Sequence, residues 1–181
     1  MKYLFTVSFI CVIILAGCSG DKVKPSIDPS LNAGEIPSQE SWNSVVFFSD
    51  SGKTKAILHA GHMRVFDKSM ETLLDQNMEV EFFNDDGHKT STLTAKRGKV
   101  NDETKDLFAY DSVVVVSDSG TVVNTDELMF RNKDKKIVSD KFVTITSPKE
   151  IIKGYGFESD QALRNYVIFN VTYTARTDTT K

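Results

Sequence analysis

The chain has 181 residues, of which 40% are hydrophobic, and its net charge is −3 at neutral pH. This balance indicates one globular domain with a tail and excludes a disordered chain; Lys and Arg form no basic tract, which argues against nucleic acid as a partner. The only cysteines are Cys11 and Cys18, so the body has no thiol and is long enough to fold without a disulfide.

Residues 1–17 have the features of a signal peptide. Lys2 precedes an apolar run of 13 residues, 4–16, which is shorter than the about 20 residues that cross a bilayer. The run closes with Leu-Ala-Gly-Cys at 15–18, which resembles the lipobox of bacterial lipoproteins. We therefore expect cleavage before Cys18 and acylation of Cys18, which would hold the mature chain on a membrane. An uncleaved anchor and a plain secretory signal are the alternatives.

Residues 18–41 are expected to form a flexible linker that begins with the acylated cysteine. Three of the four prolines, Pro25, Pro29 and Pro37, lie there among polar residues, and such a segment buries too little to order itself. The folded domain is expected over residues 42–175, followed by a polar tail at 176–181.

The domain opens with strand patterns. Residues 42–48 and 54–65 are expected to be extended on either side of a turn at Ser51-Gly52. Residues 78–83 alternate between apolar and polar side chains, and Asp86-Gly87 is a strong hairpin signal.

Residues 67–74 are ambiguous. Met70, Leu73 and Leu74 fit one turn of a helix, but eight residues are too few for a stable helix. We expect an irregular connection or a short strand here.

One pattern repeats between residues 89 and 171. In each copy a polar segment leads to a strand: LTAKRGKV to SVVVV, NTDELMF to KFVTIT, and ESDQAL to NYVIFNV. With Val113, Val143 and Val171 as equivalent anchors, the copies are 30 and 28 residues apart. Such a period is typical of stacked units that bury one face together. We expect an all-β fold of repeated antiparallel strands, with an ordinary β-sandwich as the alternative.

The last expected strand covers residues 166–173. Its alternation places Val167, Phe169, Val171 and Tyr173 on one face. No later element is available to cover this strand, so its open edge could accept a strand from a partner protein.

Candidate polar sites are weak. His59 and His62 are three residues apart and would point to opposite faces of a strand. The acidic pairs at 85–86 and 126–127 lack the spacing of a calcium loop, and Gly154-Tyr155-Gly156 has no phosphate-loop context. We therefore expect no metal site, no cofactor and no catalytic residue, and we expect that the protein is not an enzyme; a carboxylate hydrolase is the least favoured reading.

Apolar side chains of the repeats would line one side of the stacked strands. The residues in question are Val113, Val115, Leu128, Phe130, Val143, Ile145, Phe169 and Val171. Two interpretations remain open: a closed core filled by these side chains, or a groove that shelters the acyl chains of a lipid.

Four longer runs extend this pattern over residues 47–171. They are FFSDSGKTKAILHAGHMRVFD, MEVEFFNDDGHKTSTLTAKRGKV, DLFAYDSVVVVSDSGTVVNTDELMF and KIVSDKFVTITSPKEIIKGYGFESDQALRNYVIFNV. Together they resemble the LptC family, the periplasmic component of the lipopolysaccharide export ABC transporter. The resemblance implies a twisted, open β-jellyroll.

The resemblance also implies a function, which is to accept lipopolysaccharide from the inner-membrane transporter and pass it along a periplasmic bridge of jellyroll proteins. The implied partners are lipopolysaccharide, the transporter's jellyroll-bearing membrane subunits, and the soluble bridge protein LptA or an equivalent. A structural or surface-display lipoprotein with a closed β-sandwich and no lipid ligand is the alternative.

One feature departs from the family pattern. Many relatives are held by a transmembrane helix, whereas the lipobox with Cys18 would take that role here. We expect a periplasmic protein that is lipid-anchored to the inner membrane, with the outer membrane as the alternative.

Overall fold

The computed structural model describes residues 36–176, and every regular element in this range is a β-strand. The strands are β1 (Gln39–Asp50), β2 (Lys53–Phe66), β3 (Glu71–Phe83), β4 (Lys89–Ala95), β5 (Arg97–Asn101), β6 (Leu107–Ser117), β7 (Val122–Arg131), β8 (Lys136–Thr146), β9 (Glu150–Asp160) and β10 (Tyr166–Arg176). The predicted signal peptide, Cys18 and most of the predicted linker lie outside the described residues.

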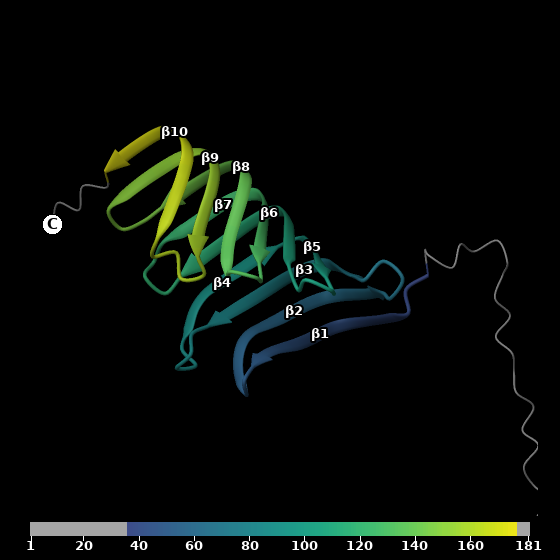
Figure 1. Cartoon of the computed structure of the whole chain (residues 1–181). Helices are drawn as coiled ribbons and strands as arrows, with labels where there is room; N and C mark the ends of the chain where they lie inside the picture. Colours follow the sequence, from purple (N-terminus) through teal and green to yellow (C-terminus); the bar gives the residue numbers. More distant parts are fainter. Residues whose placement is uncertain (1–35, 177–181) are drawn as a thin grey trace, which may run out of the picture. The chain divides into compact units, whose positions relative to one another are not determined.

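The strands form one antiparallel sheet in which strands that follow each other in the chain lie side by side, except β4 and β5 (Figure 1). The order is β1-β2-β3-β4-β6-β7-β8-β9-β10, and β5 pairs with β3 and β6. β1 and β10 each pair with a single neighbour and form the two edges. This ladder confirms the predicted all-β fold of repeated antiparallel strands and is consistent with a twisted β-jellyroll.

The long strands change direction about halfway along. In β3 the change falls at Gln76 and Asn77, with φ values of 58° and 70°, and in β6 at Asp111 and Ser112, with 64° and 54°. The pairing registers of these strands shift at the same places. Left-handed residues and register shifts are typical of β-bulges, which bend a strand. The sheet therefore folds over along a line of bulges.

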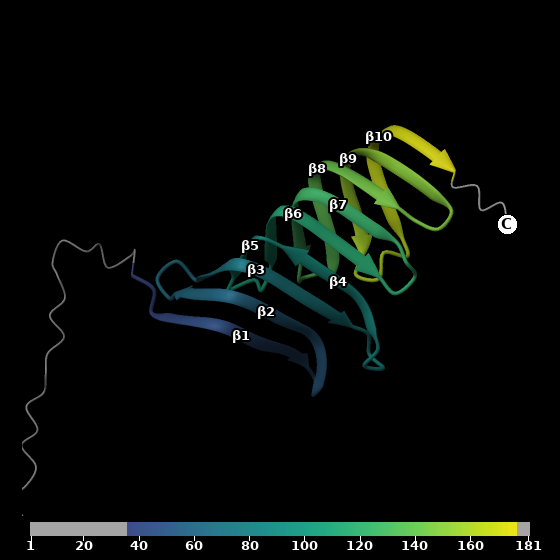
Figure 2. The same cartoon turned by 180° about the vertical axis from the view of Figure 1, so that it is seen from behind.

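The bend divides the sheet into two layers, which face each other (Figure 2). By strand pairing, layer A contains residues 39–42, 62–66, 71–75, 97–101, 107–110, 127–131, 136–139, 157–160 and 166–168. Layer B contains residues 44–50, 53–60, 78–83, 89–95, 113–117, 122–125, 142–146, 150–155 and 170–176.

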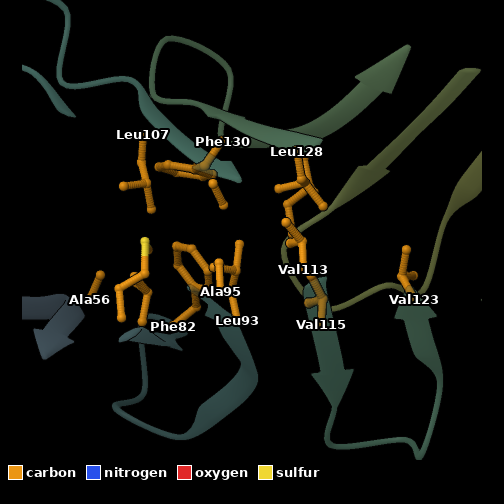
Figure 3. Packing of buried hydrophobic residues seen from close by; sticks show 14 of the residues in the cluster. Ala56, Phe82, Leu93, Ala95, Leu107, Val113, Val115, Val123, Leu128 and Phe130 are labelled. Carbon is orange, nitrogen blue, oxygen red and sulfur yellow. The ribbon is translucent and has the colours of Figure 1, made fainter. Parts of the chain in front are cut away.

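The core lies between the two layers. In β6, Val113 and Val115 are buried, whereas Val116 is 43% exposed, as expected from the period of two in a strand. Figure 3 shows Leu107, Leu128 and Phe130 on one side of the core, opposite Phe82, Leu93 and Ala95. Each fully buried Val, Leu or Phe side chain stabilises the fold by about 1.5–3 kcal/mol.

One sequence expectation needs correction. Residues 71–74 belong to the long strand β3 rather than to an irregular connection or a separate short strand, and only residues 67–70 form a turn. The bulge at Gln76 and Asn77 interrupts the alternation of β3, so the sequence shows no continuous strand pattern there. The segment LTAKRGKV is divided between the two layers, because Lys96 separates β4 in layer B from β5 in layer A.

Candidate lipid-binding interior and sheet edges

Six of the eight predicted groove residues lie together in the interior. Val113, Val115, Val143 and Ile145 project from layer B, and Leu128 and Phe130 project from layer A. Phe130 is the most accessible of the six, and its side chain is only 9% exposed. The repeat in the sequence thus predicted which side chains gather here, while their contact with a lipid stays a prediction.

The other two predicted groove residues lie elsewhere. Phe169 and Val171 belong to the edge strand β10, and neither is part of the buried cluster. Phe169 is 66% exposed and its ring passes across Gly156 of β9, where any Cβ would come within 2.9 Å of the ring. The structure therefore places Phe169 and Val171 with the predicted partner-binding edge.

The interior is filled by the protein's own side chains. Phe82 of layer B and Phe130 of layer A meet across it with ring centroids 5.1 Å apart and planes tilted by 48°, a favourable geometry for an aromatic pair. Phe82 and Leu107, which sequence reasoning did not select, belong to the same cluster. The signal that the sequence offered for Phe82 was its alternation with polar neighbours in the strand. An acyl chain could occupy this interior only if the layers moved apart.

A cleft of about 530 Å³ lies along the bend near the β1 edge. It is lined by Asn43, Ser44, Val45, His59, Ala60, Gly61, Asn77, Met78, Glu79, Thr94, Ala95, Lys96 and Ser112. Ala60, Met78 and Ala95 belong to the buried cluster, so the cleft reaches core side chains from the surface. Its volume falls within the range of small-molecule pockets, and sequence reasoning did not find it.

The β10 edge carries the four residues predicted to bind a partner. Val167, Phe169, Val171 and Tyr173 are all exposed. The strand is held by pairing with β9 and by Tyr166 and Ile168, which pack against the core. Its outer edge has no pairing strand among residues 36–176, and this is the geometry that strand addition requires.

The β1 edge also carries exposed apolar side chains, namely Trp42, Val45 and Phe47. Trp42 stacks on His62 of β2 with ring centroids 5.1 Å apart, and His62 Nε2 lies 2.7 Å from the Glu40 carboxylate. The sequence predicted that residues 42–48 are extended but did not indicate this edge as a binding surface. The sheet therefore ends in an apolar edge on both sides.

One carboxylate of each acidic pair singled out in the sequence is engaged in an ion pair. Lys55 contacts Asp85, and their hydrogen bond and charge attraction lower the pKa of the Asp85 carboxyl. Glu127 lies 3.2 Å from the Lys141 ammonium. Among residues 36–176, no three His, Cys, Asp or Glu side chains are placed to hold a metal ion.

Within residues 36–176, a single sheet is folded into two layers around an apolar interior and ends on each side in a strand with only one neighbour, which defines the class of twisted β-jellyroll proteins. A family model described as "Lipopolysaccharide-assembly, LptC-related" matches residues 7–175. The chain therefore belongs to the LptC family, as its sequence predicted. Comparison with curated proteins gave no match.

Family membership assigns the protein to lipopolysaccharide transport as part of the bridge between the membranes. The family is periplasmic, associated with the inner membrane, and acts by transport rather than by enzymatic chemistry. It binds lipopolysaccharide and contacts the transporter and other bridge proteins. Within residues 36–176 no helix is long and apolar enough to cross a bilayer.

Proposed function

We propose that this protein accepts lipopolysaccharide directly from the inner-membrane ABC transporter and passes it to the next jellyroll of the periplasmic bridge. Support comes from the family match together with an apolar interior between two layers and an open edge at each end of the sheet. The chain shows no nucleotide-binding motif, so the transporter's ATPase supplies the energy and lipid is pushed from behind.

The interior is the proposed path of the acyl chains. Val113, Val115, Leu128, Phe130, Val143 and Ile145 would contact the lipid once the layers part. Covering about a dozen methylenes of one acyl chain is worth on the order of 10 kcal/mol relative to water. Because a much tighter site would trap the lipid, affinities along the bridge must be similar.

The two edges are the proposed docking sites. The β10 edge, with Val167, Phe169, Val171 and Tyr173, would pair with LptA or an equivalent soluble bridge protein. The β1 edge, with Phe47 exposed to 64%, would pair with a jellyroll-bearing subunit of the transporter. Strand pairing at both edges would make one continuous sheet across three proteins.

The N-terminal segment is the proposed anchor. Acylated Cys18 would hold the protein on the inner membrane, and residues 18–41 would act as the tether. Several acyl chains at about 0.8 kcal/mol per buried methylene give stable attachment.

The packed interior favours a second candidate function. Because Val115, Val143 and Ile145 are completely buried, the domain could be a structural or surface-display lipoprotein whose closed interior takes no ligand. This candidate predicts a folded, membrane-bound protein that never carries lipopolysaccharide.

An ATP-dependent transfer assay separates the two functions. The transporter is placed in liposomes that contain lipopolysaccharide, the full-length protein is added, and lipopolysaccharide on the protein is measured with and without ATP. The transport function predicts that the protein becomes loaded only with ATP and the transporter. A protein that stays unloaded under all conditions would contradict it and support the closed lipoprotein.

A further inference from the structure

The loop between β9 and β10 leaves layer A at Asp160 and returns to the same layer at Tyr166. Between these points it crosses to layer B at the free ends of the layers, opposite the bend, where it lies beside the start of β4 and the turn after β6 (Figure 1). We call residues 161–166 the strap and the line between the free ends of the two layers the seam.

Three hydrogen bonds join the strap to layer B. Ser91 Oγ at the start of β4 donates to the carbonyl oxygen of Gln161 at 2.6 Å. Arg164 Nη2 donates to Asp118 Oδ2 at 3.2 Å, just beyond β6. A single short segment thus binds the ends of two neighbouring strands in the opposite layer.

The third hydrogen bond runs from Tyr166 Oη to Glu150 Oε1 at 3.2 Å. Glu150 is the first residue of β9 and lies at the free end of layer B. The three contacts are therefore spread along the seam from β4 to β9.

Leu163 fixes the strap from inside. Its side chain is 1% exposed and belongs to the core cluster, although it comes from a loop. The backbone is left-handed at this position, with a φ of 54°, which is costly for a residue that is not glycine. Hydrogen bonds from the amides of Leu163 and Arg164 to Asp160 hold this conformation.

In the part of the chain that the structure describes, no other hydrogen bond or ion pair crosses the seam. The remaining hydrogen bonds and ion pairs of residues 36–176 lie within one layer or at the bend. Of the three strap bonds, the Arg164–Asp118 pair is the one accessible to water, since these side chains are 62% and 40% exposed, and such ion pairs are weak. The seam is thus closed by contacts that can be released one by one while the bend stays intact.

We propose that the strap is a releasable latch that keeps the two layers together and must open before an acyl chain enters the interior. The proposal rests on the proposed function, because it concerns how that same interior admits lipopolysaccharide. Phe82 and Phe130 meet across the layers, so a lipid gains space only when the layers separate. The bend is continuous backbone, which leaves the seam as the side that opens.

A reversible lock tests the latch. In the full-length protein, Asp118→Cys and Arg164→Cys are bridged by a bismaleimide whose spacer contains a disulfide, and binding of purified lipopolysaccharide is measured before and after the spacer is cleaved by a reductant. A latch held shut lowers the fraction of binding-competent protein, so the bridged protein should bind about tenfold more weakly and recover on cleavage. Each single-cysteine variant treated with the same reagent controls for Cys11 and Cys18.

Release of the latch tests the same idea without a crosslink. Ser91→Ala combined with Arg164→Ala removes two strap bonds but keeps Leu163, and it should speed the association of lipopolysaccharide. Arg131→Ala is the matched control, because Arg131 pairs with Asp134 and Glu158 inside layer A and should leave association unchanged.

The outcomes separate the latch from the proposed function. Unchanged binding in the bridged protein, with the unmodified protein binding normally, overturns the latch alone. An unmodified protein that binds no lipopolysaccharide overturns the proposed function, and the latch with it.

Discussion

Leu163 is the residue on which closure of the seam most depends. It is a single apolar side chain in a polar loop, and hydrogen bonds to Asp160 hold its left-handed backbone. Nothing in the local pattern of ESDQAL distinguishes Leu163 from an exposed loop leucine. Its role became visible only when the structure brought together the ends of β4, β6 and β9.

Replacement of Leu163 by alanine should destabilise the fold. Removing a buried leucine side chain costs about 2–5 kcal/mol, because the lost burial adds to a cavity. Val116→Ala, at a position that is 43% exposed, is the control and should cost less than about 1 kcal/mol. Urea unfolding of both variants measures the difference. Equal free energies of unfolding would show that Leu163 does not hold the strap.

Tyr166 should make the stability of the strap sensitive to alkaline pH. Burial, together with the negative charge of Glu150, raises the pKa of the Tyr166 hydroxyl in the folded protein. The folded state therefore holds the proton more tightly than the unfolded state, whose tyrosine pKa is about 10. The stabilisation from this hydroxyl is complete below that pH and is lost as the pH rises through the folded-state value.

Comparing the wild type with Tyr166→Phe separates the effect of the Tyr166 hydroxyl on stability from the effects of other tyrosines and lysines. At pH 8 the wild type should be more stable by about 0.5–1.5 kcal/mol, the usual net value of one hydrogen bond. Above about pH 10 the advantage should shrink. Urea unfolding at several pH values provides the measurement, and a constant difference across the series would argue against the Tyr166–Glu150 bond.

At the scale of the strand, the two edges should have different partners. Phe169→Asp places a charge on the β10 edge and should abolish binding to the soluble bridge protein while leaving the transporter contact intact. Phe47→Asp on the β1 edge should have the reverse effect. Both side chains are about equally exposed, at 66% and 64%, so neither change should unfold the domain. Pull-down of each variant with each partner measures these effects. Loss of both partners from either variant would contradict separate docking sites.

Most strands could be predicted because alternation of apolar and polar residues has a short period. The prediction failed where a bulge interrupts this period, at Gln76 and Asn77 in β3. Bulges depend on how the sheet bends as a whole. A short stretch of sequence therefore shows where the alternation stops, but it does not show that the strand continues beyond that point.

At the scale of the whole molecule, the mature chain is expected to carry its anchor at Cys18. Metabolic labelling with a fatty acid should mark the wild type and the Cys11→Ser variant but not Cys18→Ser, because Cys11 lies inside the predicted signal peptide. Labelled bands on gels of purified protein give the result. Label that persists in Cys18→Ser would rule out Cys18 as the acylated residue.

Part of the candidate site could be predicted, because repeated segments place equivalent side chains on the same face of the sheet. Val113, Val143 and their neighbours gather in the interior because equivalent positions of stacked strands face the same way. Phe169 and Val171 fit the same pattern but lie in β10, beyond which no strand of residues 36–176 continues the sheet. Whether a repeated apolar position is covered depends on its place in the stack, which periodicity does not encode.

The most direct test of the account asks whether lipopolysaccharide passes between the two layers. Benzoylphenylalanine replaces Phe130, which faces the interior, or Phe142, which is 41% exposed, and each variant is irradiated while the transporter hydrolyses ATP. Transport through the interior predicts lipopolysaccharide adducts at position 130 and few at position 142. A folded protein that gives no adduct at position 130 while the transporter is active would contradict the account.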